Sequence, residues 1–337
     1  MNHPINFFRF VFTIIIAFLH FRTISRTYLY SGYIVVEFFF IISGYFLCHT
    51  CLNKNIGAIK YLKERFRRFW LKSIIIGLLL TNYCVVIKSD FNKIVQHFLS
   101  ILAMLQATIP FNDNIDAVYP LWYLSVLIYG GFIIYVIITN LHKQYTIILL
   151  SLIFVCYAYL FNTINIESNK LMTPFIRGFA GISVGCLLYN FINISRTKIN
   201  TNLINLLSLT SVVVSTALLF QKNIHGIIPT ICYIFIIIAC FNKESILYRL
   251  LNKSIFSKWS AISFEVFIGH MIVIKIVFFI SGYLLKNKSL HNLTICEISI
   301  ISIIYIISLV IFAYIYQKVC NYIQGHIDKL LTNDTTA

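Results

Sequence analysis

The feature that most constrains this chain is a series of long apolar runs that recurs along its whole length. A hydrophobic stretch of about 18 or more residues can cross the hydrocarbon core of a bilayer as a helix. A helix also satisfies its own backbone N–H and C=O groups, which lipid cannot do. The runs lie at residues 5–22, 33–52, 70–88, 97–110, 119–140, 144–163, 174–194, 204–220, 224–241, 259–285 and 295–320.

These runs predict an all-α fold, a polytopic transmembrane helix bundle. The run at 97–110 is short for a span and is predicted to be interfacial or re-entrant, which leaves about ten spanning helices and both termini on one side. Sixteen of the 27 Lys and Arg residues fall in loops on that side and eight on the other. Because cytoplasmic loops are enriched in Lys and Arg, we expect both termini to be cytoplasmic.

The composition supports a membrane protein and argues against other classes. Hydrophobic residues make up 59% of the 337 residues and charged residues 11%. The net charge of +16 lies between apolar runs rather than on a soluble basic face, so it does not predict nucleic-acid binding. We expect residues 1–325 to form one membrane domain and 326–337 a short cytoplasmic tail. The outer loop at 89–118 is the expected lid or substrate-facing element.

The nine cysteines are scattered, mostly inside apolar runs, and predict no disulfide framework. Cys48 and Cys51 bracket His49, which resembles a metal-binding spacing. A metal site needs at least three protein ligands, and no second cluster supplies them. We therefore predict no metal.

The first apolar run carries two ionisable side chains, Arg9 and His20. Eleven residues at 100° each bring them to one helix face, about 16 Å apart along the axis. With the termini inside, Arg9 lies near the cytoplasm and His20 near the exterior. Two interpretations stay open on spacing alone, because both side chains can also reach the interfaces by snorkelling.

Glu37 lies about one turn from the outer end of the second run, at the expected depth of His20. A carboxylate beside an imidazole orients the ring and raises its basicity, as a general base requires. The alternative is a structural ion pair with Arg22 or Arg26. An ionisable residue inside a span is by default a candidate functional residue.

The inner loop at 53–72 is strongly basic and includes Arg65, Arg67 and Arg68. Such a cluster can bind anionic lipid headgroups. It can equally hold a phosphorylated cofactor, because the arginine fork matches phosphate oxygens. The charge count does not separate the two.

The late run 259–285 contains Glu265 and His270. Five residues apart, they differ by about 140° around the helix and do not share a face. His270 has a structural alternative, a packed histidine bonded to a neighbouring helix.

Several motifs in order along the chain resemble the acyltransferase-3 family of integral membrane O-acyltransferases. The first is Arg9-x10-His20. The second is VVEFFFIISGYFL at 35–47, with Glu37, Ser43 and Gly44. Later come Arg65-Phe-Arg67-Arg68, PLWYLSVLIYGGF with Trp122, and WSAISFEVFIGHMIV with Glu265 and His270. Leu127 and Ile128 stand where many members carry a glutamate.

The resemblance implies transfer of an acetyl group from cytoplasmic acetyl-CoA to a hydroxyl of a surface or lipid-linked polysaccharide, in the inner membrane of a bacterium. His20 would be the base or a transient acyl carrier, Glu37 would orient it, and Arg9 would neutralise the donor or stabilise the oxyanion. The cofactor would be held by Arg65, Arg67 and Arg68. Ser43, Trp122, Glu265 and His270 would be substrate-binding or structural polar residues. The competing class is a transporter or flippase of a glycan or lipid-linked intermediate, which also buries ionisable residues.

Overall fold

The computed structural model describes residues 2–54, 56–86, 90–108, 120–141, 144–161, 172–195, 200–284 and 293–333, and within these the fold is helical. The elements are α1 (His3–Ser25), η1 (Gly32–Ile34), α2 (Val35–Lys54), α3 (Ala58–Val86), α4 (Phe91–Leu102), η2 (Gln106–Thr108), α5 (Trp122–Ser125), η4 (Val126–Gly130), α6 (Gly131–Leu141), α7 (Tyr145–Phe161), α8 (Thr173–Ser195), α9 (Thr201–Leu218), α10 (Ile227–Phe241), α11 (Ile246–Leu251), α12 (Ile255–Ser260), α13 (Ser263–Leu284) and α14 (Ile295–Asn333).

The predicted runs correspond to helices, and two of them are interrupted. The run at 119–140 contains a five-residue π-helix, η4, between α5 and α6. The run at 259–285 is divided where α12 ends and α13 begins. The run at 97–110 overlaps α4 and η2. π-Helical turns inside α-helices are often found at functional sites, and α5 and η4 lie beside the site described below.

Seven helices of the described chain are long and apolar enough to cross a membrane. They begin at His3, Gly32, Trp122, Thr173, Thr201, Ser263 and Ile295. The helices α7 and α10 are apolar but shorter. The polytopic helical bundle is therefore confirmed, and the number of spans and their orientation stay predictions.

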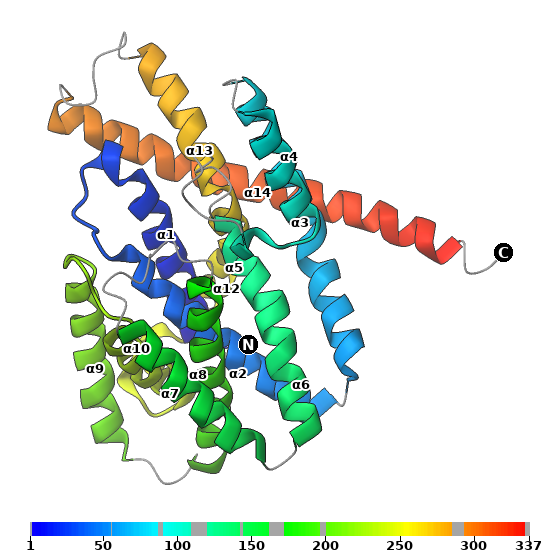
Figure 1. The fold of residues 1–337 in the computed structure, drawn as a ribbon. Coiled ribbons are helices and arrows are strands. Elements are labelled where there is room, and N and C mark those ends of the chain that lie inside the picture. The colour runs from blue at the N-terminus through cyan, green and yellow to red at the C-terminus, as the bar shows by residue number, and fades with distance from the viewer. Residues whose placement is uncertain are drawn as a thin grey trace.

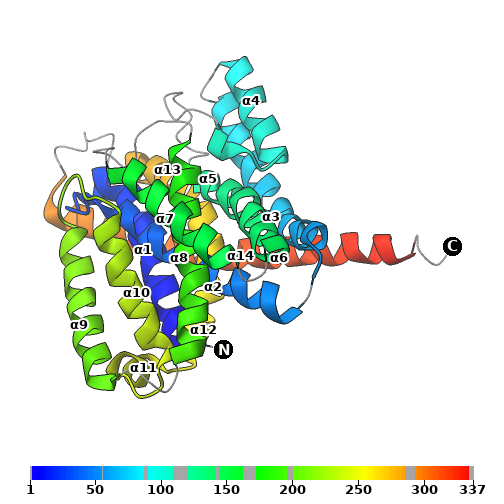
Figure 2. The same cartoon turned by 60° about the horizontal axis from the view of Figure 1, so that its bottom comes forward.

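The bundle surrounds α1, which contacts α2, α12, α13 and α14. On one side α9 and α10 stand next to each other, and α2 lies against α8 (Figure 1). The helix α14 is 39 residues long and continues past residue 325, where we expected the tail to begin. Its C-terminal part extends away from the bundle (Figure 2). Of the outer loop at 89–118 that we expected as a lid, residues 90–108 carry α4 and η2, and residues 89 and 109–118 lie outside the described residues.

Helices α2 and α8 are in backbone contact because glycines of each helix lie against the backbone of the other. A Cβ atom on Gly44 would lie 2.0 Å from the carbonyl oxygen of Ile182, and one on Gly185 would lie 1.9 Å from that of Ile41. Gly181 and Gly185 form a small-xxx-small pattern, which lets membrane helices approach closely. This contact fixes the depth of Glu37 against α8.

Adding a methyl group at this contact should destabilise the bundle. We expect Gly185→Ala to lower the free energy of unfolding by about 1–3 kcal/mol, because the new Cβ has to displace backbone rather than a flexible side chain. The matched control is Gly325→Ala, also within a helix, where a Cβ meets nothing within 4 Å. Thermal unfolding of the detergent-solubilised variants measures both; equal midpoints would contradict the close packing.

Candidate active site

Helix α1 positions Arg9 and His20 on the side that faces α13. Its start is fixed by Asn2, whose side chain accepts a hydrogen bond from the backbone N–H of Ile5 at 3.0 Å. Arg9 interacts electrostatically with Glu265 of α13. His20 stacks on His270 of the same helix, with ring centroids 5.1 Å apart. Arg9 and His20 therefore both contact α13, as residues on one face of α1 should.

Arg9 belongs to a basic cluster, which we define as Arg9, Arg65, Arg68, Lys72 and Glu265. The amino group of Lys72 lies 2.5 Å from a carboxylate oxygen of Glu265. The charges of Arg9 and Arg68 also interact with Glu265, and Arg68 with Arg65. Three cationic groups therefore interact with one buried carboxylate and a fourth, Arg65, interacts with Arg68, so the cluster has an excess of positive charge that attracts an anion.

The electrostatics of Arg68 reflect this crowding. Burial by surrounding protein, followed by the like charges of Arg65 and Arg9, lowers the pKa of its guanidinium, while Glu265 opposes the shift. Its side chain nevertheless reaches accessible surface. An accessible arginine beside two like charges is well placed to bind phosphate oxygens.

Arg67 is separated from this cluster. Its guanidinium pairs with Asp328 near the end of α14, and its side chain is 64% exposed. Residues 65 and 68 are three apart and share a helix face, whereas residue 67 lies about 200° around the helix from residue 65. The structure brings Arg65 and Arg68 toward Arg9 and directs Arg67 to α14.

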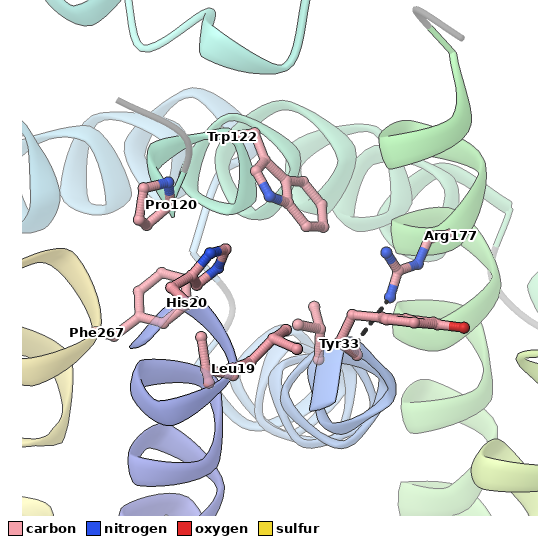
Figure 3. Close-up of a pocket in the computed structure, with 9 residues that line it drawn as sticks. Leu19, His20, Tyr33, Pro120, Trp122, Arg177 and Phe267 are labelled. Carbon is pink, nitrogen blue, oxygen red and sulfur yellow. Dashed lines mark hydrogen bonds between the residues drawn. The ribbon is translucent and has the colours of Figure 1, made fainter. Parts of the chain in front are cut away.

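A small cavity opens beside His20, and we call it the His20 cavity. It is lined mainly by apolar and aromatic side chains, with His20 and Arg177 as its ionisable groups (Figure 3). The lining residues are Ile16, Leu19, His20, Tyr33, Val36, Pro120, Trp122, Arg177 and Phe267. His20 and Arg177 lie on opposite sides of the view, with Trp122 above them and Tyr33 and Leu19 below (Figure 3). Trp122, a residue of the predicted site, is therefore placed next to His20.

A hydrogen bond made by His270 shows that its Nδ1 atom carries a proton. His270 Nδ1 lies 2.6 Å from the carbonyl oxygen of Phe267. A carbonyl oxygen only accepts, so Nδ1 carries the proton and donates it. His270 Nε2 is buried without a hydrogen-bond partner among the described residues. The ring of His270 packs against His20, which is only half-buried.

Glu37 has a partner that the sequence did not indicate. Its carboxylate accepts a hydrogen bond from Nε of Arg177 in α8 at 2.9 Å, and both side chains are almost completely buried. We expected Glu37 beside His20, or paired with Arg22 or Arg26. In the structure it holds the arginine that lines the His20 cavity.

Tyr123 lies between the basic cluster and the His20 cavity, and no pattern in the sequence distinguishes it from the other tyrosines of the apolar runs. Its hydroxyl lies 3.4 Å from the hydroxyl of Ser43 and interacts electrostatically with Arg9 and Arg65. Its ring packs on Phe267, at 5.4 Å between centroids. Because Trp122 and Phe267 line the His20 cavity, Tyr123 stands between that cavity and the basic cluster. Ser43 of the predicted site thus contacts this intermediate layer.

No group of three or more His, Cys, Asp and Glu side chains within the described ranges could hold a metal ion.

These features define a class: a helical membrane protein with an anion-attracting cluster and, farther along the same helix, a histidine beside a small aromatic cavity. Comparison with protein-family models gives the family. The model described as an acyltransferase domain matches residues 2–317, and the chain belongs to the acyltransferase-3 family. Neither the curated proteins nor the solved structures compared with the chain gave a match.

Proposed function

We propose that this membrane acyltransferase transfers an acetyl group from cytoplasmic acetyl-CoA to a hydroxyl of a surface or lipid-linked polysaccharide, in a bacterial inner membrane. The observation that carries the proposal is the placement of Arg9 and His20. Both residues lie on α1. Arg9 belongs to a basic cluster that can bind an anionic donor, and His20 lines a small cavity. Family membership supplies the acyl transfer itself.

The donor end is explained by charge. Coenzyme A carries phosphate groups, and arginine donates paired hydrogen bonds to phosphate oxygens. Arg65 and Arg68 would hold these groups from α3, and Arg9 would contribute a third positive charge from α1. Lys72 and Glu265 fix the cluster between α3 and α13 through their ion pair.

The acceptor end is explained by the weakness of hydroxyls as nucleophiles. A hydroxyl needs a base to remove its proton, or an acyl carrier that reacts more readily than the thioester. His20 would serve in one of these roles. Glu37 would act on the cavity through Arg177, its partner, rather than by its expected contact with the imidazole.

The basic cluster and the His20 cavity are closer together than the spacing of Arg9 and His20 along α1 indicates. Along α1, Arg9 and His20 are about 16 Å apart. On α13 their partners, Glu265 and His270, are five residues and thus only about 7.5 Å apart. A long Arg9 side chain accounts for part of the difference. The layer that an acyl group has to pass is therefore short and is formed in part by Tyr123 and Phe267.

The discriminating experiment follows a label. Membranes containing the protein are incubated with acetyl-CoA labelled in the acetyl group, and label is measured in isolated polysaccharide. An acyltransferase gives covalent label that alkali releases as acetate. A transporter or flippase would move glycan across the membrane without labelling it, and that result would contradict the proposal.

A further inference from the structure

The His20 cavity contains a buried cation, Arg177, that can contact a reacting group directly. Arg177 is 4% exposed and lines the cavity with His20. Arg9 was expected either to neutralise the donor or to stabilise the oxyanion, and it lies in the basic cluster about 16 Å along α1 from His20. A group that stabilises developing charge has to lie within hydrogen-bond reach of the reacting oxygen. Arg177 shares a cavity with His20, and Arg9 does not.

Three neighbours fix the Arg177 guanidinium. Its Nε donates to Glu37 at 2.9 Å, and its second terminal nitrogen (Nη2) donates to the backbone carbonyl of Tyr33 at 3.3 Å. Its central carbon lies 5.6 Å from the ring centre of Trp122. These contacts come from α2, η1 and α5. A guanidinium has five N–H donors, and the two hydrogen bonds that Arg177 makes to described residues leave others for a ligand in the cavity.

A purely structural role explains this pair less well. Burying two charges has a large desolvation cost, and well-packed hydrophobic residues often replace a buried ion pair without loss of stability. A fixed cation in a water-poor cavity is also the arrangement that stabilises a developing anion most strongly, since it needs little reorganisation when the charge appears. The Glu37 partner keeps the site neutral overall before reaction.

We infer that Arg177 binds the oxyanion formed during acyl transfer and that Glu37 positions it; this rests on the proposed function. The acceptor oxygen forms a bond to the acyl carbon while its proton passes to His20. The carbonyl π pair moves to the acyl oxygen, which Arg177 stabilises through its unused N–H groups. The intermediate then collapses, the C–S bond breaks, and the coenzyme A thiolate takes the proton from His20.

The test measures labelled acetyl transfer and donor affinity in Arg177→Ala. Loss of an oxyanion donor typically lowers kcat by about 10²- to 10³-fold. We expect that loss, with the KM for acetyl-CoA changed less than threefold because the basic cluster is untouched. Millimolar methylguanidinium should restore part of the kcat by occupying the vacated space, whereas methylammonium should restore less because it lacks the planar fork. A structural role predicts no such rescue.

A second variant guards against misfolding. Glu37→Gln/Arg177→Met removes both charges, so no unpaired carboxylate stays buried, and it should remain folded but inactive. A kcat within threefold of the wild type in this variant, or an Arg177→Ala defect that methylguanidinium does not relieve, would overturn the inference. If the wild-type protein transfers no label at all, the proposed function fails instead.

Discussion

Replacing His20 with alanine is expected to abolish acyl transfer while leaving the amount of protein in the membrane unchanged. His20 is the one imidazole among the lining residues of the His20 cavity. A positioned general base contributes about 10²- to 10⁴-fold to rate, so residual transfer should fall by a factor in that range. The KM for acetyl-CoA should change little, because the basic cluster lies around Arg9, eleven residues before His20 in α1.

The matched control for His20 is His326→Ala. His326 is an exposed histidine near the end of α14, so its loss removes the same chemical group far from the cavity. Labelled acetyl transfer per molecule of membrane protein is measured for both variants. If His20→Ala retains more than a tenth of wild-type transfer, the imidazole is not the base or the acyl carrier.

Donor binding should depend on Arg65 and Arg68 together. Charge-assisted hydrogen bonds contribute about 1.5–3 kcal/mol each, so replacing both residues with glutamine should weaken acetyl-CoA binding by about 100-fold or more. Their guanidinium groups lie near Arg9, which leaves one strong cation of the three in place. Titration of the purified protein with acetyl-CoA measures the dissociation constant directly.

The chain provides an internal control for this prediction. Arg67 lies between the two residues in sequence but pairs with Asp328. Arg67→Gln removes the same kind of charge from the same helix turn and should change donor affinity less than threefold. If all three arginines contribute equally to acetyl-CoA affinity, the separation of Arg67 from the donor site is wrong. If the double variant binds acetyl-CoA normally but loses affinity for anionic vesicles, the cluster is a lipid-headgroup site.

The sequence predicted the elements of the fold well because span length and apolarity are local properties. The run at 144–163 became α7, Tyr145–Phe161, and the run at 174–194 became α8, Thr173–Ser195. The interruption at η4 was not visible, because VLIYG is as apolar as its surroundings. A packing contact explains it in part: Val126 of η4 fits against Gly178 of α8.

The site was only partly predictable, for the same physical reason. Helical periodicity placed Arg9 and His20 on one face and separated Glu265 from His270 by about 140°. In the structure Glu265 pairs with Lys72 of α3 and also interacts with Arg9 of α1, while His270 stacks on His20 of α1. Periodicity relates residues within a helix and gives no information on which helices are neighbours. The contacts of Glu37 with Arg177, and of His20 with His270, both depend on neighbouring helices.

One signal for Arg177 was present in the sequence. It is a charged residue inside an apolar run, and such residues are by default functional candidates. The glycines at 178, 181 and 185 also indicated a helix that packs closely against another. Together, the buried charge of Arg177 and these glycines predict that α8 packs closely against a helix that carries a carboxylate. They do not identify that helix as α2.

The most direct test of the account measures transfer across the membrane in vesicles whose cytoplasmic face is outward. Labelled acetyl-CoA is added outside, and acceptor polysaccharide is present only in the lumen. We expect covalent acetate on the lumenal polysaccharide, and none in vesicles that carry His20→Ala. Unlabelled lumenal polysaccharide, or labelling that persists without His20, would contradict it.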